Sequence, residues 1–354
     1  MNIATRLGLP DERFARMVVT TKMLFSNVLG HAAELHYEKE LMREGVSFIK
    51  APTDVSYDYT VEGQRDQVKR FESASTDDEY VAANLTKTHG DRSGAGGFYQ
   101  RTGFDRLVLF DVGFRSKYII PAADIPTNPR YPDCLPGKYR MRRPFDLSED
   151  AFLTGFLAAM KSANSHFIDA IESLRTEYNL TYLELLERAC GLTAEEIDSL
   201  FSDDNFRLVV GAKGFAGEEH FNMLMDEWGV PYEQMRDMYS KHDHLVKGHI
   251  RAQIKTPYGR GMDAGHYSFK THKSHGHGVG ELYRADEFDV VALFVGFEMD
   301  PAFSPYIPAR TVPAFVFIPA SDLEQHPDFP GHLKRVTRVP RERYSVNSKE
   351  WLGN

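Results

Sequence analysis

Two places in the chain combine a carboxylate, an amide and an ammonium group around a tight turn. In the first, Asp58 precedes the turn residues Glu62-Gly63, and Gln67 and Lys69 follow them. Side chains alternate between the two faces of a strand, so Gln67 and Lys69 share the face that can meet Asp58 across a hairpin. Carboxylate and amide oxygens suit a hard cation such as Mg²⁺. A neighbouring lysine can stabilise charge developing on a phosphate or help position an attacking water molecule.

The same combination occurs a second time in the chain. Asp243, Gln253 and Lys255 stand in the same relation, with one additional residue in the turn. A helix that precedes each set carries a further carboxylate in the pattern Gly-x-x-x-Glu, at Glu34 and at Glu218. Structural roles are the alternative, because turn-flanking aspartates, edge-strand lysines and glutamates in a first helical turn are common. The recurrence of the whole set favours the chemical interpretation.

Both sets belong to a longer internal repeat. Residues 30–46 and 214–230 share the pattern Gly-x-Ala-x-Glu-x-His and end in Gly-Val. Four further landmarks follow in the same order: 57–69 and 242–255, Lys87-Thr88-His89 and Lys270-Thr271-His272, 104–110 and 288–294, and 118–124 and 315–322. Chance would not preserve such an order, so we interpret the chain as a duplication.

Each repeat contains one helix followed by strands. In the first repeat the pattern predicts a helix over 32–44 that ends at Gly45, then a hairpin closed by Glu62-Gly63. Later strands are predicted at 107–112 and 117–122. This order indicates an α/β fold with a mixed central sheet flanked by helices.

Residues 153–205 have no counterpart in the repeat. Their apolar residues recur at helical spacing, and Gly191 marks a stop, which predicts two or three helices. The acidic character of these helices favours a structural connector over a helix-turn-helix DNA reader. The predicted organisation is therefore a first repeat over 1–152, a small helical insert over 153–205 and a second repeat over 206–354.

Composition restricts the class of protein. The 354 residues are 42% hydrophobic and 26% charged, as in ordinary globular domains. We find no apolar run of membrane-spanning length, no secretory signal pattern and no P-loop for a nucleotide cofactor. Two distant cysteines, Cys134 and Cys190, fit a reducing cytoplasm. A net charge of −9 disfavours indiscriminate coating of nucleic acid but allows a local basic groove.

Each repeat resembles the PD-(D/E)xK nuclease superfamily, which includes restriction and homing endonucleases and Holliday-junction resolvases. The matching elements of the first repeat are Glu34, Asp58, Gln67-Val68-Lys69 and Ile120-Pro121. Those of the second are Glu218, Asp243, Gln253-Ile254-Lys255 and Ile318-Pro319. The resemblance covers most of each repeat and none of the insert. The glutamine departs from the pattern, since many members carry a carboxylate there.

The resemblance implies two tandem restriction-endonuclease-like domains and a role for each matching residue. Asp58 and Asp243 would be the main metal ligands, assisted by Glu34 and Glu218, while Gln67 and Gln253 would stand in the carboxylate position. Lys69 and Lys255 would be catalytic. The expected cofactor is Mg²⁺, for which Mn²⁺ would substitute.

Double-stranded DNA is the expected partner. Its two strands require two active sites, which a tandem repeat can supply in one monomer with an internal pseudo-twofold axis. We expect a Mg²⁺-dependent, sequence-specific endonuclease of restriction or homing type that cuts one strand per repeat. The candidate DNA contacts are Lys87, His89, Arg92, Arg140, Arg142, Arg143, Lys270, His272 and Lys273.

Two alternatives stay open at this point. One is a structure-specific repair or junction-resolving nuclease in which one site is silent. The other is a non-catalytic DNA-binding protein of nuclease fold. The presence of Asp, Gln and Lys in both repeats speaks against the second alternative.

Overall fold

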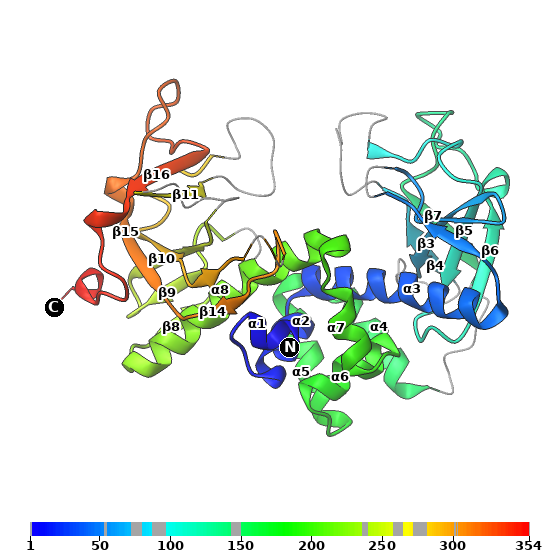
Figure 1. The fold of residues 1–354 in the computed structure, drawn as a ribbon, viewed down its shortest axis with the longest axis horizontal. Coiled ribbons are helices and arrows are strands. Elements are labelled where there is room, and N and C mark those ends of the chain that lie inside the picture. Colours follow the sequence, from blue (N-terminus) through cyan, green and yellow to red (C-terminus); the bar gives the residue numbers. More distant parts are fainter. Residues whose placement is uncertain are drawn as a thin grey trace. The chain divides into compact units, whose positions relative to one another are not determined.

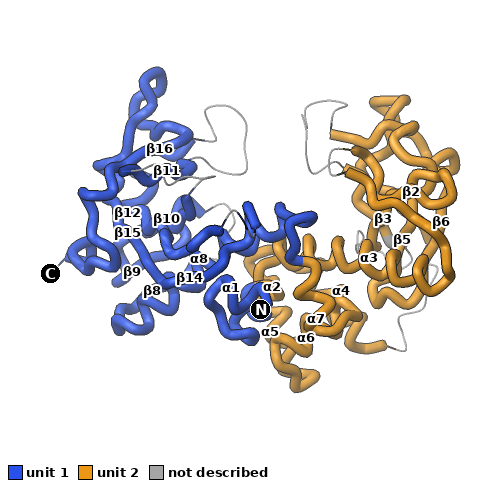
Figure 2. The backbone as a smooth tube through the Cα atoms, in the orientation of Figure 1, with its two compact units in different colours: residues 1–17, 201–354 blue, residues 18–200 orange. Residues whose placement is uncertain are grey.

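The computed structural model describes residues 2–52, 55–71, 80–86, 97–142, 150–235, 240–257, 265–271, 282–300, 302 and 304–353. The chain divides into two compact units (Figure 2). Unit 1 combines Met1–Met17 with Phe201–Asn354, and unit 2 is Val18–Leu200. Residues 153–200, which the sequence places in a separate insert, lie in unit 2 together with the first repeat.

Unit 2 is built on one long helix and a five-stranded mixed sheet (Figure 1). Helix α3 (Lys22–Glu44) begins ten residues before the predicted start and ends at Gly45, whose φ of 69° lies in the left-handed region that favours glycine. The strand order is β1-β2-β3-β5-β6, with only β3 and β5 parallel. These strands are β1 (Phe48–Lys50), β2 (Tyr59–Val61), β3 (Gln64–Arg70), β5 (Arg106–Phe110) and β6 (Lys117–Pro121).

Strand β5 is apolar from Leu107 to Phe110 because this part of the strand is covered on both faces. Leu107 and Leu109 are fully buried in a cluster with Phe71 and Phe104. Phe110 points the other way and makes an edge contact with Tyr37 of α3, at 6.4 Å between ring centres. A central strand between two covering layers carries a continuous apolar run instead of an alternating one.

Unit 1 has the same arrangement. Helix α8 (Phe206–Trp228) ends at Gly229, whose φ is 64°. The five strands follow the order β8-β9-β10-β12-β15, again with only one parallel pair, β10 and β12. They are β8 (Tyr232–Gln234), β9 (His244–Val246), β10 (Ile250–Lys255), β12 (Val290–Phe294) and β15 (Phe315–Pro319). The predicted α/β class, with mixed sheets flanked by helices, is confirmed.

The two hairpins differ only at their tips. Val61 pairs with Gln64 across Glu62 and Gly63, whose φ values of 51° and 80° give the positive pair that a type I′ turn requires. Val246 pairs with Ile250, which confirms the additional turn residue predicted for the second copy. The additional residue lies in the turn, so β9 and β10 pair in the same way as β2 and β3. The amide of Asp58 donates to the carbonyl of Asp66 (2.8 Å), and Asp243 donates to Ala252 (2.9 Å).

Each unit adds a two-stranded antiparallel ribbon. The ribbons are β4 (Tyr80–Asn84) with β7 (Lys138–Arg142), and β11 (His266–Lys270) with β16 (Val336–Pro340). The amides of Leu135 and Leu333 donate to the carbonyls of Tyr99 and Tyr283, both at 2.8 Å, which identifies equivalent positions. From there Asn84, paired with Lys138, takes the place of Lys270, paired with Val336. The predicted match of 87–89 with 270–272 is wrong. The prediction relied on a shared tripeptide, whereas strand register matches Asn84 with Lys270.

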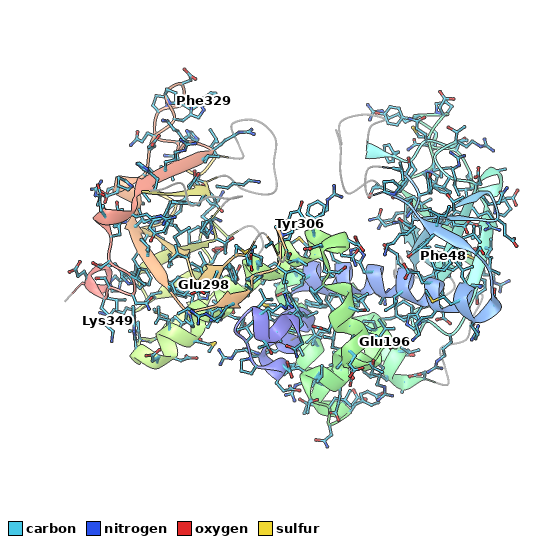
Figure 3. The ribbon with its side chains drawn as sticks, viewed as in Figure 1. Phe48, Glu196, Glu298, Tyr306, Phe329 and Lys349 are labelled. Carbon is cyan, nitrogen blue, oxygen red and sulfur yellow. The ribbon has the colours of Figure 1, made fainter. Side chains whose placement is uncertain are left out.

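Residues 150–200 form four helices, not the two or three predicted. They are α4 (Ala151–Lys161), α5 (Asn164–Glu177), α6 (Tyr182–Cys190) and α7 (Ala194–Leu200), and Gly191 is a left-handed cap as expected. These helices pack on α3: His36 Nε2 lies 2.8 Å from the carbonyl of Cys190, and Lys39 Nζ donates to Glu196 of α7 (2.6 Å). Glu196 is labelled in Figure 3. Residues 150–200 are therefore part of the packed body of unit 2.

The remaining elements are short. They are α1 (Ile3–Arg6), α2 (Asp11–Thr20), β13 (Phe297–Glu298), β14 (Arg310–Thr311) and the 3₁₀ turns η2 (Ala122–Asp124), η3 (Asp203–Asn205), η5 (Ala320–Asp322), η6 (Arg341–Arg343) and η7 (Glu350–Leu352). Both cysteines are buried and free. Within the described ranges, no helix is both long and apolar enough to span a bilayer.

The units differ in how they fill the space between long helix and sheet. In unit 2, the fully buried Asp66 carboxylate accepts two hydrogen bonds from Arg106 (2.7 Å each) and one from the Tyr37 hydroxyl (2.6 Å). The equivalent positions in unit 1 are apolar and buried: Ala252, Val290 and Phe221. A buried ion pair and an apolar set of similar shape are two solutions to one packing problem.

We predict that Asp66→Ala alone lowers the unfolding free energy of unit 2 by about 3 kcal/mol, since it leaves the Arg106 guanidinium without its partner. The triple change Tyr37→Phe, Asp66→Ala, Arg106→Val, which copies unit 1, should retain most of the stability. Urea unfolding followed by circular dichroism measures both. Trp228 and Trp351, the only tryptophans, lie in unit 1, so their fluorescence is an internal control. Equal losses in the single and triple variants would contradict the prediction.

Candidate active sites

One cluster of carboxylate, amide and ammonium side chains lies in unit 2. It consists of Glu34, Asp58, Gln67 and Lys69, and we call it the Glu34 site. Helix α3 supplies Glu34, β3 supplies Gln67 and Lys69, and Asp58 directly precedes β2. The Asp58 Oδ2 atom accepts a hydrogen bond from the backbone amide of Val68 (2.7 Å) and another from the Gln67 side-chain amide. Hairpin register therefore determines where the carboxylate stands.

The Glu218 site of unit 1 consists of Glu218, Asp243, Gln253 and Lys255. Its Asp243 Oδ2 accepts from the Ile254 amide (2.7 Å) and from Gln253 Nε2 (2.5 Å), as in the other site. Gln67 and Gln253 are each only 2% exposed. The structure thus brings the predicted Asp, Gln and Lys of each repeat together around one hairpin. It places the predicted glutamate on the long helix that packs against that sheet.

Each site lysine lies beside a tyrosine that the sequence analysis missed. Lys69 Nζ is 5.9 Å from the centre of the Tyr99 ring, and Lys255 Nζ is 5.4 Å from that of Tyr283. Each tyrosine is buried edge-on against a phenylalanine, with ring centres 5.7 and 5.5 Å apart. The signal in the sequence is the pattern Tyr-x-x-x-x-Phe-Asp, which begins at 99 and again at 283.

The aspartate of that pattern holds the strand that carries the site glutamine and lysine. The backbone amide of Arg65 donates to Asp105 Oδ2 (2.8 Å), and the Arg65 guanidinium donates to both carboxylate oxygens. Arg251 and Asp289 make the same three contacts in unit 1. Arg65 is the second residue of β3, and Asp105 directly precedes β5. The contacts between them therefore hold β3 against its parallel neighbour β5. These residues also escaped the sequence analysis.

Burial and neighbouring charges shift the pKa values of the two carboxyl groups in the Glu34 site in opposite directions. Burial, and then the nearby Glu34 carboxylate, raise the pKa of Asp58 to about 7. Burial also acts to raise the pKa of Glu34, but His31, Lys69 and Lys50 outweigh it, so this pKa is lowered. His31 Nδ1 lies 3.5 Å from Glu34 Oε2. A cation bound here would replace the proton on Asp58.

The Glu218 site lacks two of those cationic neighbours. Phe215 and Gln234 occupy the positions of His31 and Lys50, and Gln234 Nε2 donates a long hydrogen bond to Glu218 (3.4 Å). Burial, and then Asp243, raise the pKa of Glu218 to about 8. Burial likewise raises the pKa of Asp243. The pKa values of both carboxyl groups in this site are therefore raised, whereas in the Glu34 site only the pKa of Asp58 is raised.

Histidines flank Asp243, and one of them belongs to the core. His244 is fully buried, and its Nε2 lies 2.7 Å from Asn222 Oδ1. Burial lowers the pKa of His244 to about 3, so the ring is neutral and replaces the buried Tyr59 of the other unit. It does not add to the donor set of the site.

The donor set suits a hard divalent cation. Each site offers two carboxylates and one amide oxygen, and Mg²⁺ binds such oxygens while keeping several water molecules. Gln253 Nε2 is used by Asp243, whereas Gln253 Oε1 is buried with no hydrogen-bond partner in the described part of the chain. An unpartnered buried acceptor is costly unless it binds something. Within the same ranges, no three or more His, Cys, Asp or Glu side chains group as a metal site.

The predicted DNA contacts fall into two groups. Arg140 and Arg142 on β7 and Lys270 on β11 are exposed. Lys87, His89, Arg92, Arg143, His272 and Lys273 lie outside the described residues.

Comparison with known proteins finds matches among solved structures. No protein-family model and no curated protein matches the chain. Solved structures that match include a bacterial homing endonuclease, at 15% sequence identity and a TM-score of 0.28, over 36% of this chain and 82% of that one.

We predict that Asp58→Asn stabilises the metal-free protein in a pH-dependent way. Between a pH of about 4, where a free aspartate titrates, and about 7, the folded protein holds a proton on Asp58 that the unfolded chain has released. Stability of the wild type therefore falls as pH rises through this window. Asparagine does not titrate, so the variant avoids this loss of stability, and its side chain can still accept the Val68 hydrogen bond. The stability of the variant relative to wild type should therefore increase up to pH 7 and then level off.

Thermal unfolding in EDTA across this pH range measures the effect. Asp105→Asn is a control of opposite sign, because hydrogen bonds from Arg65 hold the pKa of Asp105 at about 2. That variant should be less stable than wild type at neutral pH. A pH-independent difference between Asp58→Asn and wild type would rule out the assigned charge state.

Proposed function

We propose that the protein is a Mg²⁺-dependent endonuclease that hydrolyses phosphodiester bonds of double-stranded DNA, with one active site in each unit. It would act as a sequence-specific enzyme of restriction or homing type within the PD-(D/E)xK superfamily. The observation that supports the proposal most is the recurrence of one arrangement. In both units a carboxylate is anchored to the amide that follows the glutamine, and a lysine stands two residues beyond that glutamine.

Each residue of the Glu34 site has a role in this proposal. Asp58 and Glu34 would hold the cation, with Gln67 fixing the orientation of the Asp58 carboxylate. When bound, Mg²⁺ would offset the charge of the scissile phosphate and lower the pKa of a water molecule. Lys69 loses solvation through burial, yet Tyr99, Asp58 and Glu34 raise its pKa, so its amine stays protonated. A protonated lysine donates hydrogen bonds to the phosphate or to the attacking water and is not a general base.

Two sites in one chain match the two strands of a duplex. Each unit would cut one strand, which most nucleases achieve by pairing two identical subunits. Because the two units differ in sequence, the recognised DNA need not be palindromic. A non-catalytic DNA-binding role would not require the same four side chains to persist in both units.

We predict that the wild type linearises supercoiled plasmid DNA in Mg²⁺. Lys69→Ala and Lys255→Ala should each accumulate nicked circles, because each removes the lysine of one site and leaves the other complete. The double variant should cut neither strand. Arg43→Ala, a change of a side chain that is 74% exposed at the far end of α3, is the charge-matched control. Absence of any cleavage by the wild type on plasmids of varied sequence would reject the nuclease proposal.

The single-site variants should also differ in their pH profiles. Lys255→Ala leaves the Glu34 site, whose limiting carboxyl, Asp58, has a pKa of about 7. Lys69→Ala leaves the Glu218 site, where the pKa of Glu218 is about 8. A carboxyl must lose its proton to hold a cation, so nicking should increase with pH in both variants and reach its plateau at lower pH in Lys255→Ala. Nicking rates at fixed Mg²⁺ test this, and a reversed order would contradict it.

A further inference from the structure

The ribbon of unit 2 has one face in the core and an opposite face that is exposed except at Ala82. On β7, Tyr139 and Met141 pack against the core cluster around Tyr99. The alternate residues Lys138, Arg140 and Arg142 are exposed. On the paired strand β4, Tyr80 and Asn84 are also exposed and lie opposite Arg142 and Lys138.

The ribbon of unit 1 shows the same division. Its buried face consists of Tyr267, Phe269, Thr337 and Val339. The opposite face exposes His266, Lys270, Val336 and Arg338 and includes the partly exposed Ser268. His266 and Arg338 line a hollow of about 370 Å³, together with Glu324 and Pro340. The carboxylate of Glu324 is taken up by an ion pair with Lys334.

Both ribbons are free of acidic residues, although the protein is acidic. The chain carries 51 Asp and Glu residues against 42 Lys and Arg, for a net charge of −9. The strands β4, β7, β11 and β16 contain no Asp or Glu, whereas they contribute Lys138, Arg140, Arg142, Lys270 and Arg338. The strands of each ribbon therefore carry only positive formal charge, which is complementary to a polyanion.

The shape of the ribbon favours duplex DNA among the possible polyanions. A two-stranded antiparallel ribbon fits the major groove of B-DNA, where arginine pairs with guanine and asparagine with adenine. Alternating side chains on one ribbon face would meet successive base edges. Arg140 lies 5.8 Å from the ring centre of Tyr80, its diagonal neighbour on β4, which restrains the guanidinium before DNA binds.

A short path joins each ribbon to the site lysine of its own unit. The amide of Leu135, three residues before β7, donates to the carbonyl of Tyr99, whose ring contacts Lys69. Leu333, Tyr283 and Lys255 repeat these contacts before β16. The ribbon and the lysine in each unit are thus held by one tyrosine.

We propose that the exposed face of each ribbon enters the major groove and reads base edges, so that the two units recognise different half-sites. This inference rests on DNA being the substrate, as proposed above. The half-sites would differ because the exposed faces of the two ribbons carry different side chains. One ribbon presents Tyr80, Asn84, Arg140 and Arg142, and the other presents His266, Ser268, Lys270 and Arg338. Recognition would be asymmetric within a single chain.

Selection from duplex DNA with a fully randomised core tests the proposal. The 354-residue chain carrying Lys69→Ala and Lys255→Ala serves as the parent, so that bound DNA is not cut. The parent should select an asymmetric sequence. Adding Arg140→Ala should abolish base preference at adjacent positions of one half-site and weaken binding to the selected sequence about tenfold or more. Arg338→Ala should do the same in the other half-site only, and Arg43→Ala should change neither.

Arg140→Lys separates base reading from charge, since lysine keeps the charge and loses the bidentate geometry. It should bind random duplex as tightly as the parent does and lose the preference at the same positions. The proposal is overturned if the parent selects no sequence, if the Arg140 and Arg338 variants leave the selected sequence unchanged, or if they weaken binding to all sequences equally. Plasmid cleavage by the wild type is scored separately, so a failed ribbon and a failed nuclease give different results.

Discussion

The hydrogen bond from the Val68 amide to the Asp58 carboxylate, matched by that from Ile254 to Asp243, sets the geometry on which both sites depend. A backbone donor has no rotamers, so the carboxylate is positioned as accurately as the strand itself. The strand is in turn held by hairpin pairing on one side and by an arginine–aspartate clamp and a parallel neighbour on the other. Glutamine, lysine and carboxylate then converge without further adjustment.

The two units keep this frame and vary what surrounds it. In unit 2, His31 and Lys50 provide positive charge around Glu34, while Phe215 and Gln234 leave Glu218 with less compensation. Behind the sheet, an ion pair in one unit is replaced by apolar packing in the other. Such changes alter proton affinity and stability while the backbone positions stay equivalent. The two units therefore differ in electrostatics more than in architecture.

Local signals made part of this structure predictable. Gly45 and Glu62-Gly63 have backbone demands that few residue types meet, and the spacing of Asp58, Gln67 and Lys69 is fixed by strand period. Contacts distant in sequence were not predictable. Tyr99 meets Lys69 only through the fold, and the early start of α3 at Lys22 follows from tertiary packing of its apolar face. Ribbon register was missed because a tripeptide match carries no information about strand pairing.

The division of each ribbon into a core face and a solvent face has an evolutionary consequence. Residues such as Arg140 and Arg338 take no part in the packed clusters that stabilise the units, so replacing them costs little folding free energy. The buried face and the path to the lysine remain under full constraint. Under the proposed function, recognition would thus drift one half-site at a time, while the position and chemistry of cleavage would be inherited unchanged.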